Sequence, residues 1–408
     1  MRLSTLAGVS VLAVCLAAPS FAVCPGVGSC PALAGCPPEA KLVEPTDSIQ
    51  SVIAGAPAEG LTVCVSPGTY IGRIDFLGKP IHLTSSGGPA VTILDGGGLG
   101  PVVRFATGEG SKSILEGVTI QNGAVSGNGA GISIDNASPT IRNVVVRNNR
   151  AIGTSARGGG IAVFGAKSRP VITCSQLLDN DADYSGGGLY SAYSADPYVR
   201  SSVISGNNAA YGGGIGVAFS GRLDLGWSEI SNNAAIDGGG LHSGVAYGNV
   251  LARQVWFKGN IASDLGGAMW VPAGFAEVVN ATFDGNLASG GGALAAGFGS
   301  LVSVSSSLFV RNTTTGGSAA LIDWGGANTS LVNHYNGFFG NVGGHHANTY
   351  GSVGLLTLPS FGTSCCPTTV AEGVNAGIPD LHFNDSDGSR NDLGACGGGA
   401  LSVFGPMN

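Results

Sequence analysis

Charged residues are scarce in this sequence: they occupy 11% of its 408 positions, and the 25 Asp and Glu outnumber the 18 Lys and Arg. No basic cluster occurs, so we do not expect a nucleic-acid partner. Beyond the N-terminal leader, the sequence also lacks an uninterrupted run of about 18 apolar residues, the length that a membrane-spanning helix needs. We therefore expect no transmembrane segment once the leader has been removed.

The N-terminus has the pattern of a secretory signal peptide. Arg2 precedes a mostly apolar stretch, and small residues stand at Ser20 and Ala22, where a signal peptidase reads the chain. We expect residues 1–22 to be the signal peptide and the mature chain to begin at Val23. The protein is then secreted, to the extracellular space or to a cell surface.

Cysteines lie mainly near the two ends of the chain. Of the nine, Cys15 belongs to the leader, and the cysteine-rich segment 23–46 follows it. An even number of remaining cysteines in an exported chain indicates disulfides, but the sequence does not choose among the pairings. Cys174 stands alone in the middle of the chain, so it is either a buried small apolar side chain or a disulfide partner.

Glycine supplies 71 residues, and it recurs within an internal repeat. A glycine phrase ending in an apolar residue, such as Gly186-Gly187-Gly188-Leu189, returns with a period of about 27 residues, and an apolar residue stands three positions before a recurring asparagine. The asparagines are Asn149, Asn180, Asn207, Asn233, Asn260, Asn286, Asn312 and Asn341.

A period of about 27 residues holds two or three short strands joined by turns, because no segment between turns is long enough for a stable helix. Asparagine tolerates the left-handed backbone region, and one asparagine per coil can bond to those of the coils about 4.8 Å above and below it. Propeller blades need about 40–50 residues, and a leucine-rich repeat needs regularly spaced leucines. We therefore predict an all-β, right-handed parallel β-helix over residues 47–345, with roughly eleven rungs and a length of about 50 Å.

Several phrases carry a family resemblance. Phe257-Lys-Gly-Asn260 and Phe283-Asp-Gly-Asn286, with their glycine phrases, resemble the FxxN and GGA[ILV] repeats of polymorphic outer membrane proteins. Val63-Cys-Val-Ser-Pro-Gly-Thr-Tyr70 looks like the first rungs of pectate-lyase-like β-helix proteins. That resemblance implies a short N-terminal capping helix, and Ile49, Val52, Ile53 and Ala56 have helical spacing.

The resemblance is specific for the fold and not for an activity, because this superfamily includes lyases, hydrolases, esterases and adhesins. No series of about ten-residue alternating strands of the kind that forms a membrane barrel follows the repeats, so we expect the resemblance to end with the solenoid. The phrase Asp385-Ser-Asp-Gly-Ser-Arg-Asn-Asp-Leu-Gly-Ala-Cys-Gly-Gly398 resembles the ending of exported bacterial β-helix proteins. We interpret residues 346–408 as a C-terminal cap.

No catalytic residues can be assigned from the sequence. The outward row that follows the glycine phrases contains neither an acid nor an arginine, and the motifs of polygalacturonases and pectin methylesterases are absent. Asp237 and Asp264, each four residues after a repeated asparagine, are either a stacked carboxylate pair or two solvated turn residues. Asp385, Asp387 and Asp392 have a spacing that could hold calcium, with a capping turn as the alternative. We expect no other cofactor.

Aromatic residues suggest a binding function. Tyr190, His242 and Trp270 lie in the same outward row, and Gly216 leaves a gap between the first two. We predict that they form an exposed strip about 15 Å long that holds a glycan or another cell-surface component. The protein is then a non-catalytic, adhesin-like or structural envelope protein. The alternative is a polysaccharide-acting enzyme, a lyase or glycoside hydrolase, with a non-standard site.

Overall fold

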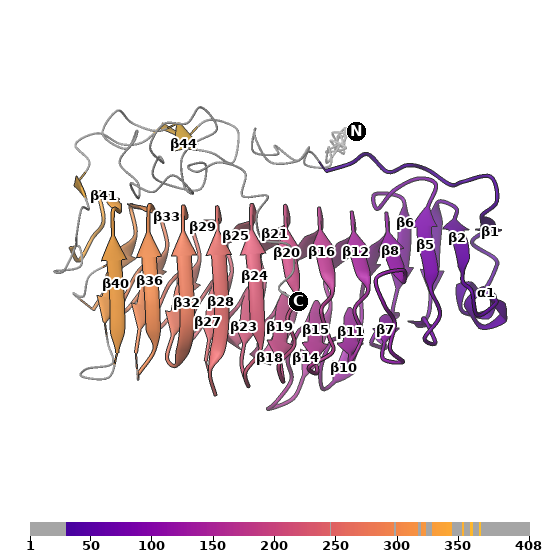
Figure 1. Cartoon of the computed structure of the whole chain (residues 1–408), viewed down its shortest axis with the longest axis horizontal. Helices are drawn as coiled ribbons and strands as arrows, with labels where there is room; N and C mark the ends of the chain where they lie inside the picture. Colours follow the sequence, from indigo (N-terminus) through magenta and orange to yellow (C-terminus); the bar gives the residue numbers. More distant parts are fainter. Residues whose placement is uncertain are drawn as a thin grey trace, which may run out of the picture.

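The computed structural model describes residues 30–244, 246–297, 299–316, 320–323, 329–344, 353–354, 360–361 and 367–368. Within them the chain winds as a parallel β-helix, and its strands stack along the long axis of the molecule (Figure 1). From residue 114 to residue 323, each full turn adds one strand to each of four parallel sheets, called A, B, C and D, which the chain visits in the order A, B, D, C. The earlier turns have no strand in sheet D. The sequence predicted two or three strands per turn, and the additional strand is the short one of sheet D.

Sheets A and B have 12 strands each in the described part of the chain. Sheet A consists of β1 (Lys41–Val43), β2 (Leu61–Val65), β5 (Ile81–Ser85), β8 (Ile114–Glu116), β12 (Thr140–Arg142), β16 (Val171–Thr173), β20 (Tyr198–Arg200), β24 (Arg222–Gly226), β28 (Gly248–Arg253), β32 (Gly274–Val279), β36 (Leu301–Ser305) and β40 (Ser330–His334). Sheet B consists of β3 (Gly68–Ile71), β6 (Thr92–Asp95), β9 (Thr119–Gln121), β13 (Val145–Arg147), β17 (Gln176–Leu178), β21 (Val203–Ser205), β25 (Glu229–Ser231), β29 (Trp256–Lys258), β33 (Thr282–Asp284), β37 (Leu308–Val310), β41 (Gly337–Phe339) and β42 (Val353–Gly354).

Sheets C and D have 10 and 8 described strands, respectively. Sheet C consists of β4 (Ile74–Asp75), β7 (Val103–Phe105), β11 (Ile132–Asp135), β15 (Ile161–Phe164), β19 (Leu189–Ala192), β23 (Ile215–Val217), β27 (Leu241–Ser243), β31 (Met269–Val271), β35 (Leu294–Ala296) and β39 (Leu321–Asp323). Sheet D consists of β10 (Ala124–Ser126), β14 (Arg150–Ile152), β18 (Asp181–Ser185), β22 (Asn208–Tyr211), β26 (Ala234–Ala235), β30 (Ile261–Ala262), β34 (Leu287–Ala288) and β38 (Thr313–Thr314). Separately, β43 (Ser360–Phe361) and β44 (Pro367–Thr368) pair antiparallel.

The corner between sheets B and D explains the repeated asparagine. The residue just before each ladder asparagine has a positive φ, as at Asn148 (53°), Asp179 (52°) and Gly206 (69°). The expected left-handed position therefore lies one residue earlier than the repeated asparagine itself. This bend turns the asparagine side chain inward, where it is buried in seven of the eight cases and half-buried at Asn341.

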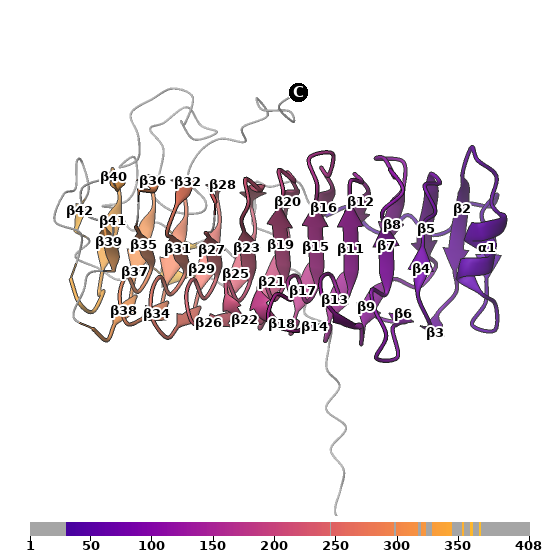
Figure 2. The same ribbon diagram turned by 90° about the horizontal axis from the view of Figure 1, so that it is seen from below.

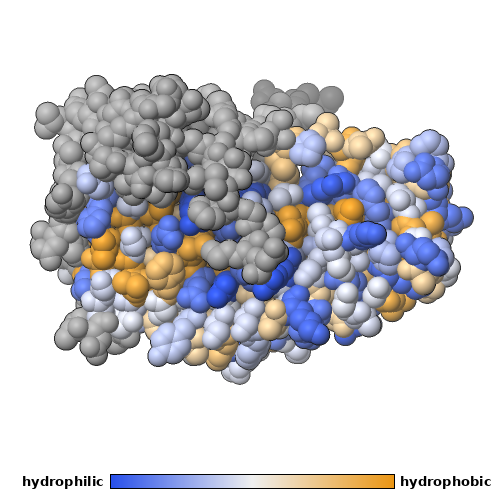
Figure 3. Space-filling model, in the orientation of Figure 1, coloured by the Kyte–Doolittle hydropathy of each residue, from blue (hydrophilic) through white to orange (hydrophobic). Residues whose placement is uncertain are grey.

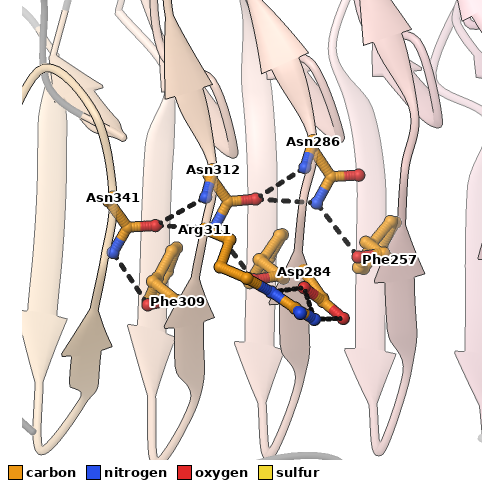
Figure 4. A network of polar contacts seen from close by, with 8 residues as sticks. Phe257, Asp284, Asn286, Phe309, Arg311, Asn312 and Asn341 are labelled. Carbon is orange, nitrogen blue, oxygen red and sulfur yellow. Dashed lines mark hydrogen bonds and ion pairs between the residues drawn. The ribbon is translucent and has the colours of Figure 1, made fainter. Parts of the chain in front are cut away.

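The eight asparagines form a continuous hydrogen-bonded ladder, part of which is drawn in Figure 4. In a typical step, Nδ2 of Asn286 donates to Oδ1 of Asn312 (2.9 Å) and to the carbonyl oxygen of Phe257 (3.0 Å). The backbone N–H of Asn286 donates to the same Oδ1 (3.0 Å). One side chain thus satisfies several buried polar groups of adjoining turns, which would otherwise cost about 1–3 kcal/mol each.

The apolar residue three positions before each asparagine points into the core. Along sheet B these residues end in a stack of four phenylalanines, with ring centroids 5.0, 4.7 and 4.9 Å apart. The stack consists of Phe257, Phe283, Phe309 and Phe338, and none of them is more than 3% exposed. The apolar position of the repeat is therefore a core position.

The N-terminal end is closed by helix α1 (Ile49–Gly55), in which Ile49 and Ile53 are buried against the first turn (Figure 2). Ser48 caps this helix by accepting a hydrogen bond from the backbone N–H of Ser51. β1 already belongs to sheet A, so the sheet begins before residue 47. None of the described helices is long and apolar enough to cross a membrane.

Two disulfides tie the N-terminal segment to the outside of the solenoid. Cys30 pairs with Cys174, and Cys36 pairs with Cys64, with Cα atoms 5.6 and 5.7 Å apart. Between these bonds the segment runs back along the helix axis toward its first turn (Figure 1). Of the two alternatives for Cys174, the structure has the disulfide, because Cys174 occupies an outer corner (φ 52°) that the N-terminal segment reaches.

Candidate functional site

The three residues of the predicted aromatic strip do lie in one row of sheet C, but they are not exposed. Strand register aligns Tyr190 with Gly216 and then His242, and His242 with Trp270 on neighbouring strands of sheet C. However, Tyr190, His242 and Trp270 are only 1%, 7% and 4% exposed. The prediction of an exposed strip is therefore wrong. Trp270 packs in a separate apolar group with Leu265.

Glycines explain why these rings are buried. A Cβ atom at Gly216 would lie 2.9 Å from Cδ2 of Tyr190, and one at Gly297 would lie 2.6 Å from a ring carbon of Trp270. An edge of each ring thus lies against a glycine, in the space that a side chain would fill. The gap at Gly216 is occupied by the Tyr190 ring together with the hydroxyl group of Ser185.

Tyr190 and His242 are the buried members of a larger group of side chains on the outer face of sheet C, which we call the aromatic cluster. Its members contact one another in an unbroken series of ring and guanidinium contacts. They are Arg157, Phe164, Tyr184, Tyr190, Tyr193, Tyr211, Phe219 and His242. Sheet C is the sheet that faces the viewer in Figure 2.

Sheet D builds one wall of the cluster. A register shift in β18 places Tyr184 beside Tyr211 at the end of β22, with ring centroids 5.3 Å apart. The Tyr211 ring in turn lies 5.3 Å from the His242 ring. Both tyrosines are half-buried, so their outer edges remain accessible.

The opposite rim comes from the corner between sheets C and A. Tyr193 and Phe219 stack there, with centroids 5.1 Å apart and ring planes 16° from parallel. Phe164 lies 5.8 Å from Tyr190 and 5.9 Å from Tyr193, and so connects this rim to the buried members. Tyr193 is 53% exposed, so part of its side chain remains accessible to a ligand.

Arg157 lies among the rings. Its guanidinium carbon is 4.9 Å from the centroid of Tyr184, 5.5 Å from that of Tyr190 and 5.8 Å from that of Phe219. These distances are within the range of cation–π attraction. The backbone N–H of Arg157 donates to Oδ1 of Asn128 (3.0 Å), which fixes the loop between β14 and β15.

Burial controls the charges at this site. It lowers the pKa of His242 to about 4, so the imidazole is neutral at neutral pH. Burial also raises the pKa of the Tyr190 hydroxyl, and the nearby Arg157 charge only partly offsets that increase. At neutral pH, Arg157 is therefore the charged side chain among the eight members of the cluster.

Asp237 borders the cluster, because its backbone forms an isolated parallel β-bridge with Tyr211 at the corner between sheets D and C. Burial raises its pKa, the backbone N–H of Leu265 lowers it by donating a hydrogen bond (3.1 Å), and the charge of Asp264 raises it. Asp264 itself is exposed. The charges of the two acids interact, but of the two carboxylates only that of Asp237 accepts a hydrogen bond from the described part of the chain.

No metal centre is found in the part of the chain that the structure describes. Asp385, Asp387 and Asp392 lie outside the described residues. Asp181 and Asp183 are engaged by the protein, because both pair with Arg150 of the preceding turn, at 3.3 and 3.2 Å.

Sheet A presents a different surface (Figure 3). Hydrophobic residues gather over its last strands, where Leu301 is 48% exposed and Phe275 is half-buried. Farther toward the N-terminus, Arg200 stacks 3.8 Å from the centroid of Tyr198 and pairs with Asp224 at 2.6 Å. This arginine already has its counter-ion, so sheet A is a weaker candidate than the aromatic cluster.

Two cluster members that were not among the predicted site residues have a regular position in the repeat. Tyr184 and Tyr211 each stand four residues after a ladder asparagine, at Asn180 and Asn207. This is the position at which Asp237 was noticed. Comparing all turns at that position would have found both tyrosines, but Arg157 comes from a turn with a longer loop and has no such regular spacing.

Comparisons with known proteins agree with the fold. The family model described as "Right handed beta helix region" matches residues 90–260, which span the aromatic cluster and the first five ladder asparagines. No match was found among the curated proteins or among the solved structures. The chain folds as a right-handed parallel β-helix, as the sequence predicts.

Proposed function

We propose that this protein is a secreted or cell-surface β-helix protein that binds glycan, without transforming it, through the aromatic cluster on sheet C. The observation that carries the proposal is the connected set of rings whose rim members, Tyr184, Tyr193, Tyr211 and Phe219, remain partly exposed. Binding sites are typically lined by aromatic side chains with a few polar groups that set orientation. The leader and the two disulfides support export.

The size of the cluster suits an oligosaccharide. Phe164 and His242 belong to strands of sheet C that lie three turns apart, which corresponds to about 14 Å at the spacing of neighbouring strands. That is the length of a few sugar units. Ring faces at the rim can pack against the apolar faces of sugars, while the hydroxyls of the rim tyrosines can exchange hydrogen bonds with sugar hydroxyls.

The second candidate function is hydrolysis of a polysaccharide. It is favoured by Asp237, a carboxyl group with a raised pKa next to the cluster, because a general acid in a glycosidase needs a raised pKa. Asp264 would then have to be the second carboxylate. Its exposure and the lack of hydrogen bonds to its carboxylate in the described part of the chain make binding without catalysis the better-supported function.

A glycan array probed with the purified mature chain, together with a depolymerisation assay on every retained polysaccharide, tests this proposal. We expect retention of one group of related glycans and no release of shorter products. Product release that is abolished in Asp237→Asn would support the hydrolase instead. Absence of retention on any glycan surface would contradict the binding function.

A further inference from the structure

Arg157 lacks the counter-ion that six other arginines of the solenoid have. In the described residues it forms no ion pair, and its buried Nε has no hydrogen-bond partner. The only acceptor for its guanidinium there is the carbonyl oxygen of Ser155, which Nη1 reaches at 3.0 Å. A guanidinium has five N–H donors and no acceptor, so most of its hydrogen-bonding capacity is unused.

Nearby acids do not compensate this charge. Asp181 and Asp183, on the next turn of sheet D, both pair with Arg150 instead. Six other arginines have an acidic partner on a neighbouring strand or turn: Arg104, Arg142, Arg150, Arg200, Arg253 and Arg311. Four further arginines of the described residues also lack an ion pair, but Arg147 donates to the side chain of Gln121, and the others, Arg73, Arg169 and Arg222, are exposed. Arg157 is therefore the partly buried arginine of that part of the chain with neither an acidic partner nor a side-chain acceptor.

The surrounding rings restrict where a partner can bind. Tyr184, Tyr190 and Phe219 occupy the space around the guanidinium, so the edge of its plane is where its free N–H groups can meet a ligand. A planar guanidinium held in this way is suited to two parallel hydrogen bonds with an oxyanion. Those bonds would be stronger than in water, because the rings exclude solvent from one side.

We propose that Arg157 is the anion-recognition residue of this site, and that the ligand is a glycan carrying an anionic substituent, a carboxylate or a sulfate ester. This inference rests on the proposed function. The column from Arg157 through Ser185 and Tyr211 to Asp237 spans three turns. The anionic sugar binds at the Arg157 end, and Asp237 repels a second anionic group at the other end, so the glycan binds in one direction.

The experiment compares three oligosaccharides with the same backbone: a neutral one, one with a carboxylate and one with a sulfate ester. The affinity of each is measured by calorimetry for the parent, Arg157→Gln, Arg157→Lys and Arg222→Gln. Arg222 is an exposed arginine on sheet A, so its replacement removes the same charge away from the cluster. Thermal melting of each variant verifies that it folds.

We expect the parent to prefer an anionic oligosaccharide over the neutral one by about tenfold or more, the size of one charge-assisted hydrogen-bonded pair. Arg157→Gln should lose that preference, so that its affinities for the anionic and neutral oligosaccharides become equal; Arg157→Lys should keep part of the preference, and Arg222→Gln should behave like the parent. The anionic oligosaccharide that binds more tightly identifies the substituent as a carboxylate or a sulfate ester.

Equal affinity of the parent for all three oligosaccharides would overturn the role of Arg157 and leave glycan binding intact. An equal loss by Arg157→Gln for neutral and anionic sugars would also overturn it, because the arginine would then act only in packing. Failure of the parent to bind any of them or any glycan on the array would overturn the proposed function itself, and this inference with it.

Discussion

The asparagine ladder and the aromatic cluster come from the same turns of the chain, yet they follow different rules. Asn207 and Tyr211 are only four residues apart, but Asn207 is fully buried and bonded to the turns on both sides, whereas Tyr211 lies at a half-exposed rim. A ladder position must carry asparagine on every turn, because each side-chain amide provides the hydrogen-bond partner of the asparagine on the neighbouring turn. A rim position has no such partner, so its residue can change from turn to turn.

Truncating a core ring of the repeat should produce the largest effect. Phe283 stacks between Phe257 and Phe309 and has no exposed surface, so Phe283→Ala should lower the free energy of unfolding by about 3–5 kcal/mol. Chemical denaturation followed by circular dichroism measures this. Phe275→Ala, on the outer face of sheet A, is the matched control and should cost far less. Equal losses in both variants would mean that inward and outward positions do not differ.

The pH dependence of stability should separate the cluster from the ladder, because amides do not titrate. The pKa of His242 is about 4 in the folded protein and about 6.5 when unfolded. Between these values the unfolded chain binds a proton that the folded chain does not, so stability falls as pH is lowered from 6.5 to 4. The full difference is about 3 kcal/mol.

This pH effect is measured as the difference between the parent and His242→Gln, with unfolding curves recorded at pH 7, 6, 5 and 4. Other titrating groups, including Asp237, are common to both proteins and cancel in the difference. A constant difference over this pH range would show that His242 is not held neutral by burial.

Removing one amide from the ladder should cost somewhat less than removing a core ring. Oδ1 of Asn260 accepts from the N–H (3.1 Å) and Nδ2 (3.0 Å) of Asn233, and its Nδ2 donates to Asn286 (3.0 Å) and to the carbonyl of Ile230 (2.8 Å). Asn260→Ala leaves these groups buried without partners, so the loss should be about 2–3 kcal/mol. In contrast, exposed Asn208→Ala should change stability by less than about 0.5 kcal/mol. An unchanged denaturation midpoint in Asn260→Ala would contradict the ladder's role.

The smallest expected change concerns the rim. Tyr193→Ala removes a ring that is 53% exposed and stacked on Phe219, so the melting temperature should hardly change. Affinity for a retained glycan should fall by about 1 kcal/mol, or roughly fivefold, which is the contribution of one aromatic contact. Tyr198→Ala, on sheet A, serves as the control and should keep full affinity. Equal affinities of Tyr193→Ala and the parent would remove this rim from the binding site.

The sequence predicts those features that every turn repeats. The β-helix and the inward phenylalanines follow from spacing alone, because each turn faces nearly the same environment. The short helix at Ile49 belongs to no repeat; the family resemblance implies it, and helical spacing supports it. The burial of Tyr190 and Trp270 could not be predicted from their row, since it depends on Gly216 and Gly297 on neighbouring strands. The role proposed for Arg157 depends on its having no acidic partner in the described residues, and the spacing of residues in the sequence cannot reveal this. The disulfide of Cys174 requires knowing that the N-terminal segment doubles back along the helix axis.

The bond between Cys30 and Cys174 has a mechanical consequence. It joins residues 144 positions apart, so the turns between them lie inside a covalently closed loop. A tension applied through the chain before Cys30 would therefore enter the solenoid at the corner of Cys174, and the first turns would carry none of it. That corner leads into β17, the strand just before Asn180 and Tyr184. A pull from the N-terminal side would thus be delivered to the part of the rod that holds the aromatic cluster.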